Sequence, residues 1–378
     1  MYIPQKQLEN LKKLIAPNKV IIVYGARRCG KTTLLEKFTE EKEVIGKYLF
    51  INAEDITVKE NLESQSIEKL KNFIGNNEYL LIDEAQKINN IGLNLKLIVD
   101  NINDIKVIVS GSSSFELGRH TGEPLTGRKF TLVLYPLSQL ELKNIEAFHE
   151  TQSSLENRLL FGAYPEVILD SSNEKRILYL REIVNSYLLK DVLELEGIKK
   201  HGMIVKLLQL LCFQVGNEVS LNELGTQLGM SKNTIEKYLD ILQDSFIIFQ
   251  LSGFGKNLRS EVTKTKKYYF YDNGIRNALI NNFNPLTMRN DVGQLWENYI
   301  IIERLKKQTY ENIFSNNYFW RTYSQQEIDW IEEREGCLFA YEIKWSKKEK
   351  QPPLQWSKSY KNSPFSLINQ QNYLDFIA

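Results

Sequence analysis

The stretch Ile21–Phe38 constrains what this chain can fold into more than any other. It opens with an apolar run that has the composition of a buried strand, and it closes with leucines and a phenylalanine at helical spacing. Between the two, Gly25–Thr32 reads GARRCGKT and fits the pattern G-x-x-x-x-G-K-[ST] without a gap. A strand, a glycine-rich turn and a helix in this order are the setting of a phosphate-binding loop, because the N–H groups of the turn and the helix N-terminus attract phosphate oxygens.

The residues of this loop have distinct expected tasks. Gly25 and Gly30 let the backbone curl so that its N–H groups point at phosphate. Lys31 can reach the β- and γ-phosphates, and the Thr32 hydroxyl can hold Mg²⁺. A chance Gly-Lys turn is the alternative, which the flanking strand and helix disfavour. The residues expected to bind the nucleotide in this loop are Gly25, Ala26, Arg27, Arg28, Cys29, Gly30, Lys31, Thr32 and Thr33.

An acidic pair follows the apolar strand Tyr79–Ile82. Asp83 stands at the carboxyl end of that strand, where it can bind Mg²⁺ through water, and Glu84 can polarise the water that attacks the γ-phosphate. Such a pair is common by itself, and a solvated strand end is its plain alternative. After a phosphate-binding loop, however, the pair is typical of a P-loop ATPase that uses ATP and Mg²⁺.

Two further residues are candidates for contact with the γ-phosphate. Ser110 ends the buried strand Lys106–Val109 and can sense that phosphate, although a serine-rich turn that caps a helix explains it equally well. Arg128 precedes the strand Phe130–Leu134 and can stabilise transition-state charge, in its own chain or in a neighbouring subunit, or form a structural salt bridge. Because strands alternate with helices here, we expect a parallel α/β sheet with the nucleotide at the carboxyl ends of its strands.

Length and composition restrict the rest of the chain. A chain of 378 residues exceeds one ordinary core, so two or three domains are expected. The net charge of +1 gives no overall attraction for nucleic acid, which must therefore bind to local patches. Three distant cysteines suit a reducing cytoplasm better than a disulfide framework. The first residues lack a signal-peptide core and no apolar run is long enough for a membrane helix, so we expect a cytoplasmic protein with no membrane partner.

Helical patterns dominate after Pro136, and one part of this region has the spacing of a known DNA-binding motif. Leu221–Leu242 has helix-turn-helix spacing, with Gly229 suited to the turn and Ser231 to the N-cap of the second helix. Two strand-like runs that follow complete a predicted winged helix. The residues expected to contact nucleic-acid phosphates are Lys232, Asn233, Lys237, Lys256, Arg259, Lys264, Lys266 and Lys267. The same unit used for packing or for contact with a protein is the alternative.

The last third carries a different constellation. Glu342 and Lys344 occupy alternate positions of a predicted strand and therefore share a face. If Asp329 lies across a hairpin from them, two carboxylates and a lysine converge, and Glu297 can approach from a helix. Glu297, Asp329 and Glu342 are thus candidate ligands of Mg²⁺ or Mn²⁺, which would activate water against a phosphodiester, while Lys344 positions the phosphodiester or offsets charge. An ordinary solvated sheet face, on which Glu and Lys alternate, is the alternative.

The whole chain resembles a large prokaryotic family of ATP-binding proteins. These have an AAA+-like ATPase core of the origin-recognition/STAND type, a winged helix, and a C-terminal domain of unknown function related to the PD-(D/E)XK nucleases. The stretches that carry the resemblance are GARRCGKTTLL, YLLIDEAQKI, VIVSGSSS, LTGRKFTLVLYPLS, GAYPEV, YYFYDNGIR, GQLWENYI, EIDWI and YEIKWS. The resemblance implies an α/β fold with a parallel-sheet P-loop ATPase core over 1–136, a helical lid over 137–200, a winged helix over 201–275 and a PD-(D/E)XK-like domain over 285–378.

The resemblance implies that Gly25, Gly30, Lys31 and Thr32 bind phosphate and Mg²⁺, that Asp83 and Glu84 form the second acidic site, and that Glu297, Asp329, Glu342 and Lys344 form the nuclease-like site. From these sites we expect a protein that binds and hydrolyses ATP with Mg²⁺, acts on DNA and can form oligomers. The expected catalytic residues are Lys31, Glu84 and Arg128 in the ATPase core, and Asp329, Glu342 and Lys344 in the nuclease-like domain. The alternative is an ATP-gated switch or scaffold that binds a protein partner and cuts nothing.

Overall fold

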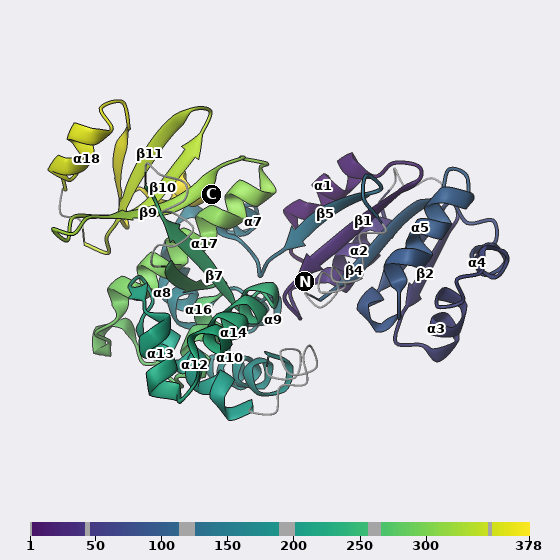
Figure 1. The fold of residues 1–378 in the computed structure, drawn as a ribbon, viewed down its shortest axis with the longest axis horizontal. Helices are drawn as coiled ribbons and strands as arrows, with labels where there is room; N and C mark the ends of the chain where they lie inside the picture. The colour runs from purple at the N-terminus through teal and green to yellow at the C-terminus, as the bar shows by residue number, and fades with distance from the viewer. Residues whose placement is uncertain (1, 42–45, 113–124, 189–200, 256–265, 347–349) are drawn as a thin grey trace. The chain divides into compact units, whose positions relative to one another are not determined.

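The computed structural model describes residues 2–41, 46–112, 125–188, 201–255, 266–346 and 350–378 (Figure 1). The chain divides into two compact units, residues 2–136 and residues 137–378. Each unit has its own sheet and its own apolar core. Among the described helices, none is both long enough and apolar enough to cross a bilayer.

A five-stranded parallel sheet forms the centre of the first unit. Its strand order is β2 (Tyr48–Asn52), β3 (Tyr79–Asp83), β4 (Lys106–Gly111), β1 (Lys19–Gly25) and β5 (Lys129–Leu134). The three inner strands are almost entirely buried, which is why they read as continuous apolar runs rather than as alternating ones. Because β4 lies between β1 and β3, the carboxyl ends of these three strands are neighbours.

Helices cover both faces of this sheet (Figure 1). On one face, α1 (Lys6–Leu14) and α2 (Lys31–Thr39) pack against alternate strand residues such as Ile21, Leu81 and Leu132. The intervening strand residues point to the opposite face, on which α5 (Ile91–Asn101) contacts β1. The remaining helices of the unit are α3 (Ile56–Leu62), α4 (Ile67–Ile74) and the 3-10 turn Ala85–Lys87.

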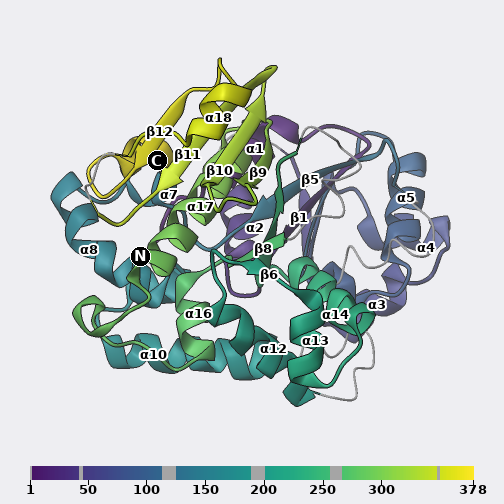
Figure 2. The same cartoon turned by 60° about the vertical axis from the view of Figure 1, so that its left-hand side comes forward.

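A seven-stranded mixed sheet runs through the second unit (Figure 2). Its strand order is β12 (Phe365–Ile368), β11 (Cys337–Ile343), β10 (Glu327–Arg334), β9 (Asn316–Arg321), β7 (Ile248–Gly253), β8 (Lys266–Phe270) and β6 (Glu218–Val219). β7 pairs in parallel with β9, β11 pairs in parallel with β12, and the other neighbours are antiparallel. The register between β10 and β9 shifts by one residue between Ile328 and Ile331, so β10 carries a bulge that contains Asp329.

The longest helix described in the second unit is α17 (Val292–Tyr310), which is buried along most of its length and contacts α8, α16 and α19. Trp296 and Ile300 of α17 are fully buried in the apolar core that the sheet and the helices share. The other helices are α7 (Gln139–Leu142), α8 (Phe148–Phe161), α9 (Pro165–Leu169), α10 (Asn173–Glu182), α12 (His201–Phe213), α13 (Leu221–Leu228), α14 (Lys232–Asp244), α16 (Asn273–Leu279), α18 (Leu354–Ser359) and α19 (Tyr373–Ile377), with the 3-10 turn Leu286–Met288.

α13 and α14 form the expected helix-turn-helix arrangement. Gly229 closes α13 in the left-handed conformation, and Ser231 caps α14 by accepting a 3.2 Å hydrogen bond from the N–H of Thr234. Gly225 allows the turn to lie close against α13, because a side chain there would come within 2.7 Å of the Met230 carbonyl oxygen. Gly229 and Ser231, which the sequence assigns to the turn and to the N-cap, therefore do take these positions between α13 and α14.

The sheet of the second unit extends across the predicted winged helix and the predicted C-terminal domain. β7 and β8, the strands predicted for the wing, pair with each other and continue the sheet of β9 to β12, and residues 137–378 cluster as one compact unit. The division into lid, winged helix and C-terminal domain stays a prediction. Within the region predicted to be helical after Pro136, α10 is followed directly by a π-helical stretch, Ile183–Leu188.

Candidate functional sites

The turn Gly25–Lys31 lies where β1 ends and α2 begins. A side chain at Gly25 would collide with the Leu134 carbonyl oxygen at the end of β5. Gly30 has a φ of 97°, a conformation that L side chains rarely adopt. Both positions of the motif thus require glycine for reasons of local geometry.

Lys31 and Thr32 occupy the first turn of α2. The Lys31 ammonium folds back over the turn and donates to the carbonyl oxygens of Gly25 and Ala26 at 3.0 and 2.9 Å. The Thr32 hydroxyl donates to Asp83 Oδ2 at 2.7 Å, across to the end of β3. The loop lysine and the strand carboxylate therefore lie at one edge of the sheet, as their spacing predicts.

Asp83 is buried between two hydroxyl groups. Its second carboxylate oxygen, Oδ1, accepts a hydrogen bond from the Ser110 hydroxyl at the end of β4. The Ser110 oxygen in turn accepts from the backbone N–H of Glu84 at 3.3 Å. Since β4 separates β1 from β3, Ser110 reaches Asp83 from the neighbouring strand, whereas Thr32 reaches it from the helix. Thr32 and Asp83 present the oxygen donors that suit a hydrated Mg²⁺.

Glu84 follows Asp83 in the left-handed region, with a φ of 54°. Its carboxylate accepts a hydrogen bond from the Gln86 side chain within the turn that follows β3. The left-handed conformation directs the chain away from the strand at this point, immediately beside the Asp83 carboxylate.

Several other loop residues are placed around the turn. Ala26 and Cys29 are buried, and the Cys29 thiol donates to the Leu134 carbonyl oxygen at 3.4 Å. Arg28 and Thr33 are exposed and Arg27 is half-buried. Gln5, to which no sequence motif assigns a role, donates from Nε2 to the Cys29 carbonyl oxygen at 3.1 Å. No local pattern identifies this contact, because it joins the start of α1 to a loop that is distant in sequence.

Arg128 lies at the opposite edge of the sheet. It immediately precedes β5, and its carbonyl oxygen accepts a hydrogen bond from the N–H of Val20, near the start of β1. The guanidinium forms a 2.6 Å ion pair with Asp100. Because all five strands are parallel, their amino ends lie away from the phosphate-binding turn. The expectation that Arg128 serves the site of its own chain is therefore wrong, while action on a neighbouring subunit stays a prediction.

In the second unit, Asp329, Glu342 and Lys344 lie together. The Lys344 ammonium is 3.0 Å from Asp329 Oδ2 and 2.9 Å from Glu342 Oε1, which confirms the pairing of this lysine with acids. Asp329 also accepts from the N–H of Ile343 at 2.8 Å, so it lies across the hairpin of β10 and β11. Burial alone would lower the pKa of Lys344, but the charges of the two carboxylates outweigh it and raise that pKa.

Glu342 is nearly inaccessible to solvent. Its Oε1 also contacts the Lys350 ammonium, whereas its Oε2 is buried with no hydrogen-bond partner among the described residues. Burial, reinforced by the charge of Asp329, raises the pKa of Glu342.

Glu297 approaches the same region from α17, as expected. Its Oε1 accepts a 2.8 Å hydrogen bond from the Tyr269 hydroxyl and lies 4.0 Å from the Lys267 ammonium, both on β8. Burial and the nearby charge of Asp329 raise the pKa of Glu297 to about 7. Across the part of the chain that the structure describes, no three His, Cys, Asp or Glu side chains are arranged to hold a metal ion. The carboxylates of this cluster are paired with lysines, so the candidate ligands Glu297, Asp329 and Glu342 do not form a ready three-ligand site.

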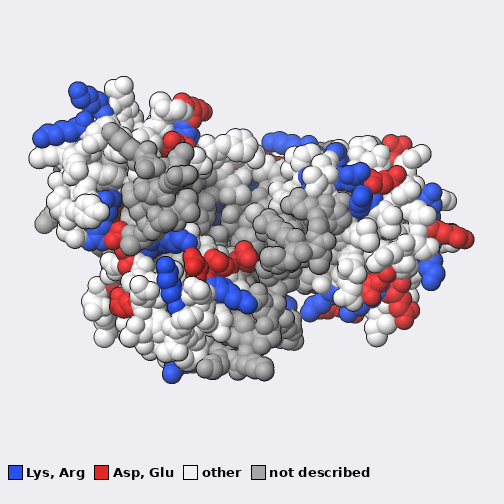
Figure 3. Space-filling view, in the orientation of Figure 1, with Lys and Arg blue, Asp and Glu red and all other residues white. Residues whose placement is uncertain are grey.

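The surface of the helix-turn-helix offers fewer basic groups than the sequence indicates. Lys232, Asn233 and Lys237 lie on α14 and are at least partly exposed. Lys256, Arg259 and Lys264 lie outside the described residues. Lys267 is completely buried, so its assignment to a DNA-contacting wing is wrong. Over the visible face of the molecule, acidic and basic side chains lie next to one another (Figure 3).

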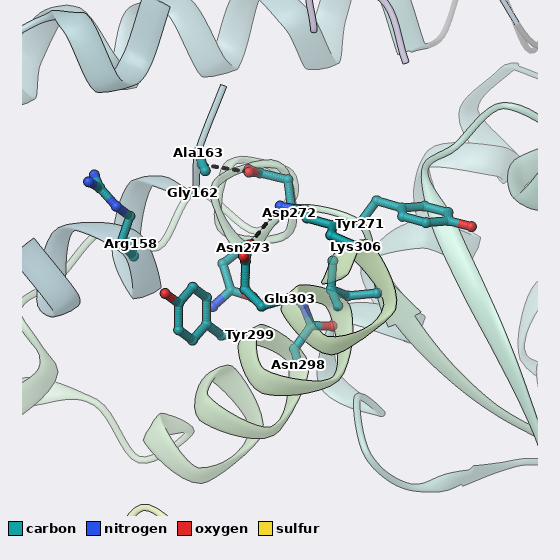
Figure 4. A pocket seen from close by; sticks show the side chains of 11 residues that line it. Arg158, Gly162, Ala163, Tyr271, Asp272, Asn273, Asn298, Tyr299, Glu303 and Lys306 are labelled. Atoms are coloured by element: carbon teal, nitrogen blue, oxygen red, sulfur yellow. Dashed lines mark hydrogen bonds and ion pairs between the residues drawn. The ribbon is translucent and has the colours of Figure 1, made fainter. Parts of the chain in front are cut away.

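Three stretches singled out in the sequence, GAYPEV, YDNGIR and GQLWENY, meet at a polar pocket in the second unit (Figure 4). The buried Asp272 carboxylate accepts hydrogen bonds from the N–H groups of Ala163 and Ile275 at 2.7 and 3.1 Å. Asn298 of α17 donates to Asn273 at 2.7 Å on the same side of the pocket. These contacts join α8, α16 and α17, which indicates a structural role for the three stretches.

Three family models match successive parts of the chain. An AAA domain matches residues 17–143, a "Domain of unknown function (DUF8612)" matches residues 152–286, and a "Domain of unknown function (DUF4143)" matches residues 292–368. The chain is 26% identical to an uncharacterized protein of Methanocaldococcus jannaschii, over 90% of this chain and 78% of that protein. It is also 26% identical to an uncharacterized protein of Mycobacterium tuberculosis, over 88% of this chain and 72% of that protein.

Two solved structures show a distant likeness. DnaA from Aquifex aeolicus, bound to AMPPCP, is 14% identical with a TM-score of 0.31, over 63% of this chain and 86% of that chain. A STAND protein with a tetratricopeptide repeat sensor from Pyrococcus horikoshii is 12% identical with a TM-score of 0.30, over 81% of this chain and 46% of that chain. These scores are too low to support an argument. The AAA match and the geometry of its parallel sheet together identify the first unit as an AAA+-like P-loop ATPase domain.

Proposed function

We propose that the protein binds ATP with Mg²⁺ at the carboxyl edge of the five-stranded sheet and hydrolyses it there. The observation that carries this proposal is the hydrogen-bonded set Thr32–Asp83–Ser110, which lies beside Lys31 at the N-terminus of α2. Hydroxyl and carboxylate oxygens of this set suit Mg²⁺, which would neutralise charge on the phosphates.

Each part of the site has a separate role in ATP binding and hydrolysis. The backbone N–H groups of the turn and the positive end of α2 hold the phosphates. Lys31 exchanges its two loop carbonyl partners for β- and γ-phosphate oxygens. Glu84 orients the attacking water once its carboxylate turns from Gln86 toward the nucleotide, and Ser110 senses the γ-phosphate from β4.

The test is a comparison of two site variants with a matched control. Lys31→Ala should weaken ATP binding at least about tenfold, because charge-assisted hydrogen bonds to the phosphates are lost. Glu84→Gln should preserve binding and slow turnover about 100-fold, because the amide cannot polarise water. Lys37→Ala, which removes a lysine that pairs with Glu40 at the other end of the same helix, should change neither. A Lys31→Ala protein that binds and hydrolyses ATP like the wild type would contradict the proposal.

We further propose that DNA is the molecule on which this ATPase acts. The support is the helix-turn-helix of α13 and α14, whose second helix carries Lys232, Asn233 and Lys237 at its surface. A protein partner bound through the same helices is the alternative.

A second candidate activity is cleavage of phosphodiesters in the second unit. It is favoured by the convergence of Asp329, Glu342 and Lys344, with the unpartnered Glu342 Oε2 as a buried acceptor among the described residues. Lys344 would position the phosphate and offset its charge. Because the described carboxylates do not make a three-ligand site, no metal-dependent step is assigned to them. Without cleavage, the protein is an ATP-gated switch or scaffold.

A further inference from the structure

Lys267 is the most unusual charged residue of the second unit. It lies on β8 and its side chain is completely buried. The ammonium is 5.0 Å from the centre of the Phe319 ring on β9 and contacts the carboxylate of Glu327 at the start of β10. Since an unpaired buried ammonium strongly destabilises a folded protein, a lysine persists in this position only where carboxylates compensate its charge.

The carboxylates around Lys267 are those of the C-terminal cluster. Glu297 lies 4.0 Å from the ammonium, and Glu327 contacts it directly. Burial alone would lower the pKa of Lys267, but the charges of Glu297, Glu327 and Asp329 outweigh burial and raise it. Two carboxylates, those of Glu297 on α17 and Glu327 on β10, therefore lie within 4.0 Å of one ammonium, and the charge of Asp329 acts on it as well.

The carboxylate of Glu297 is also fixed by its other neighbours. Tyr269, two residues after Lys267 and on the same face of β8, donates its hydroxyl to Glu297 Oε1. Gly216 lies against the other side, because a side chain there would come within 2.9 Å of both carboxylate oxygens. Glu297 is thus held toward Lys267, whereas Asp329 and Glu342 share Lys344.

We propose that Lys267 is the resident cation of this cluster, and that its ammonium balances the charge of Glu297 and Glu327 in the place of a metal ion. Glu297 is then a partner of Lys267 and no longer a metal ligand. The strand expected to contact DNA therefore supplies a buried charge to the nuclease-like cluster. This assignment holds whether or not the cluster cleaves DNA.

The test replaces Lys267 and asks whether a metal ion takes its place. Lys267→Ala leaves the carboxylates of Glu297 and Glu327 without their ammonium, and a divalent cation held by these two side chains and by water should bind in its place. We expect one additional Mn²⁺ per chain relative to the wild type in a titration of the full-length protein. In a thermal unfolding experiment, Mn²⁺ at about 100 times its Kd should raise the midpoint of this variant by at least about 4 °C more than that of the wild type.

Lys306→Ala is the matched control. Lys306 is also buried in the same unit, but it forms an ion pair with one carboxylate, that of Glu303, and donates to the Leu137 carbonyl oxygen. Its removal should destabilise the protein without creating a Mn²⁺ site. Lys267→Gln, which keeps most of the side-chain volume and removes the charge, provides a second variant if the alanine protein does not fold.

The outcomes separate this inference from the proposed activities. If neither Lys267 variant gains Mn²⁺ binding over the wild type, or if both lysine positions respond equally, Lys267 does not hold the place of a cation. Cleavage of DNA by the wild type, or its absence, is measured independently and does not affect the assignment of Lys267.

Discussion

At the scale of single residues, Asp272 illustrates the cost of a buried carboxylate. It caps α16 and accepts a hydrogen bond from the N–H of Ala163, which fixes the turn after α8. Burial raises the pKa of Asp272 to about 6, although the backbone hydrogen bonds and the charge of Lys306 partly oppose this increase. Asp272 therefore fixes the turn after α8, and its raised pKa also makes the stability of the folded protein depend on pH.

The direction of that dependence follows from the two pKa values. In the unfolded chain Asp272 loses its proton near pH 3.8, whereas in the folded protein it keeps the proton up to about pH 6. Between these values the folded state binds more protons, so the contribution of Asp272 to stability falls as the pH rises, by about 3 kcal/mol in total, and is constant above about pH 6.

Urea unfolding from about pH 4 to about pH 7 measures this contribution as the difference between the wild type and Asp272→Asn. We expect the wild type to lose stability relative to the variant as the pH rises to about 6. Asparagine lacks a titrating group, so its effect on packing shifts the variant equally at every pH. A difference that is independent of pH would show that Asp272 is ionised throughout.

At the scale of elements, α14 carries what remains of the predicted DNA-binding surface. Lys232 and Asn233 stand in its first turn, next to the cap at Ser231. Each lysine that neutralises a phosphate releases counterions, so its removal should weaken binding and lower the steepness of the salt dependence by about one unit.

We therefore expect Lys232→Ala with Lys237→Ala to weaken binding of duplex DNA at least about tenfold and to flatten its dependence on salt. Lys358→Ala on α18 removes an exposed lysine from another helix and serves as the control. Fluorescence anisotropy at several salt concentrations provides the measurement. Binding that is insensitive to both salt and the α14 substitutions would favour a protein partner.

Elements were predictable where one local pattern dominates. The inner parallel strands appear in the sequence as short apolar runs, and Ser231 marks the start of α14. The joining of β7 to β9 was not predictable, because parallel pairing between distant segments leaves no local periodicity. The same holds for the bulge at Asp329, which changes the direction of side chains on a strand that otherwise alternates.

The positions of single residues were likewise predictable only where a local sequence pattern determines them. The neighbourhood of Thr32 and Asp83 could be predicted, since both stand at the carboxyl edge of a parallel sheet, one just after β1 and the other at the end of β3. Lys267 could not, because a lysine within a basic run has the pattern of an exposed strand end. Its burial depends on Glu297 and Glu327, which come from distant parts of the chain.

At the scale of the whole molecule, the central question is whether the second unit cleaves DNA. Asp329 and Glu342 are buried and share Lys344, so the ion pairs with this lysine hold the three side chains together. The cluster could bind a phosphodiester through Lys344 while its carboxylates act on water, or it could serve only to stabilise the hairpin of β10 and β11.

Incubation of linear DNA with the full chain, with and without Mg²⁺ or Mn²⁺, distinguishes these possibilities. The proposed activity predicts weak cleavage that Asp329→Ala and Glu342→Ala abolish and that Glu335→Ala, at an exposed position of the turn after β10, leaves intact. Because removal of either buried carboxylate leaves Lys344 with one partner fewer, the thermal midpoint of each variant must be measured alongside. Loss of cleavage with a folded protein supports the nuclease activity. Intact DNA with every metal, together with ATP hydrolysis that Lys31→Ala removes, would instead identify an ATP-gated switch whose second unit binds without cutting.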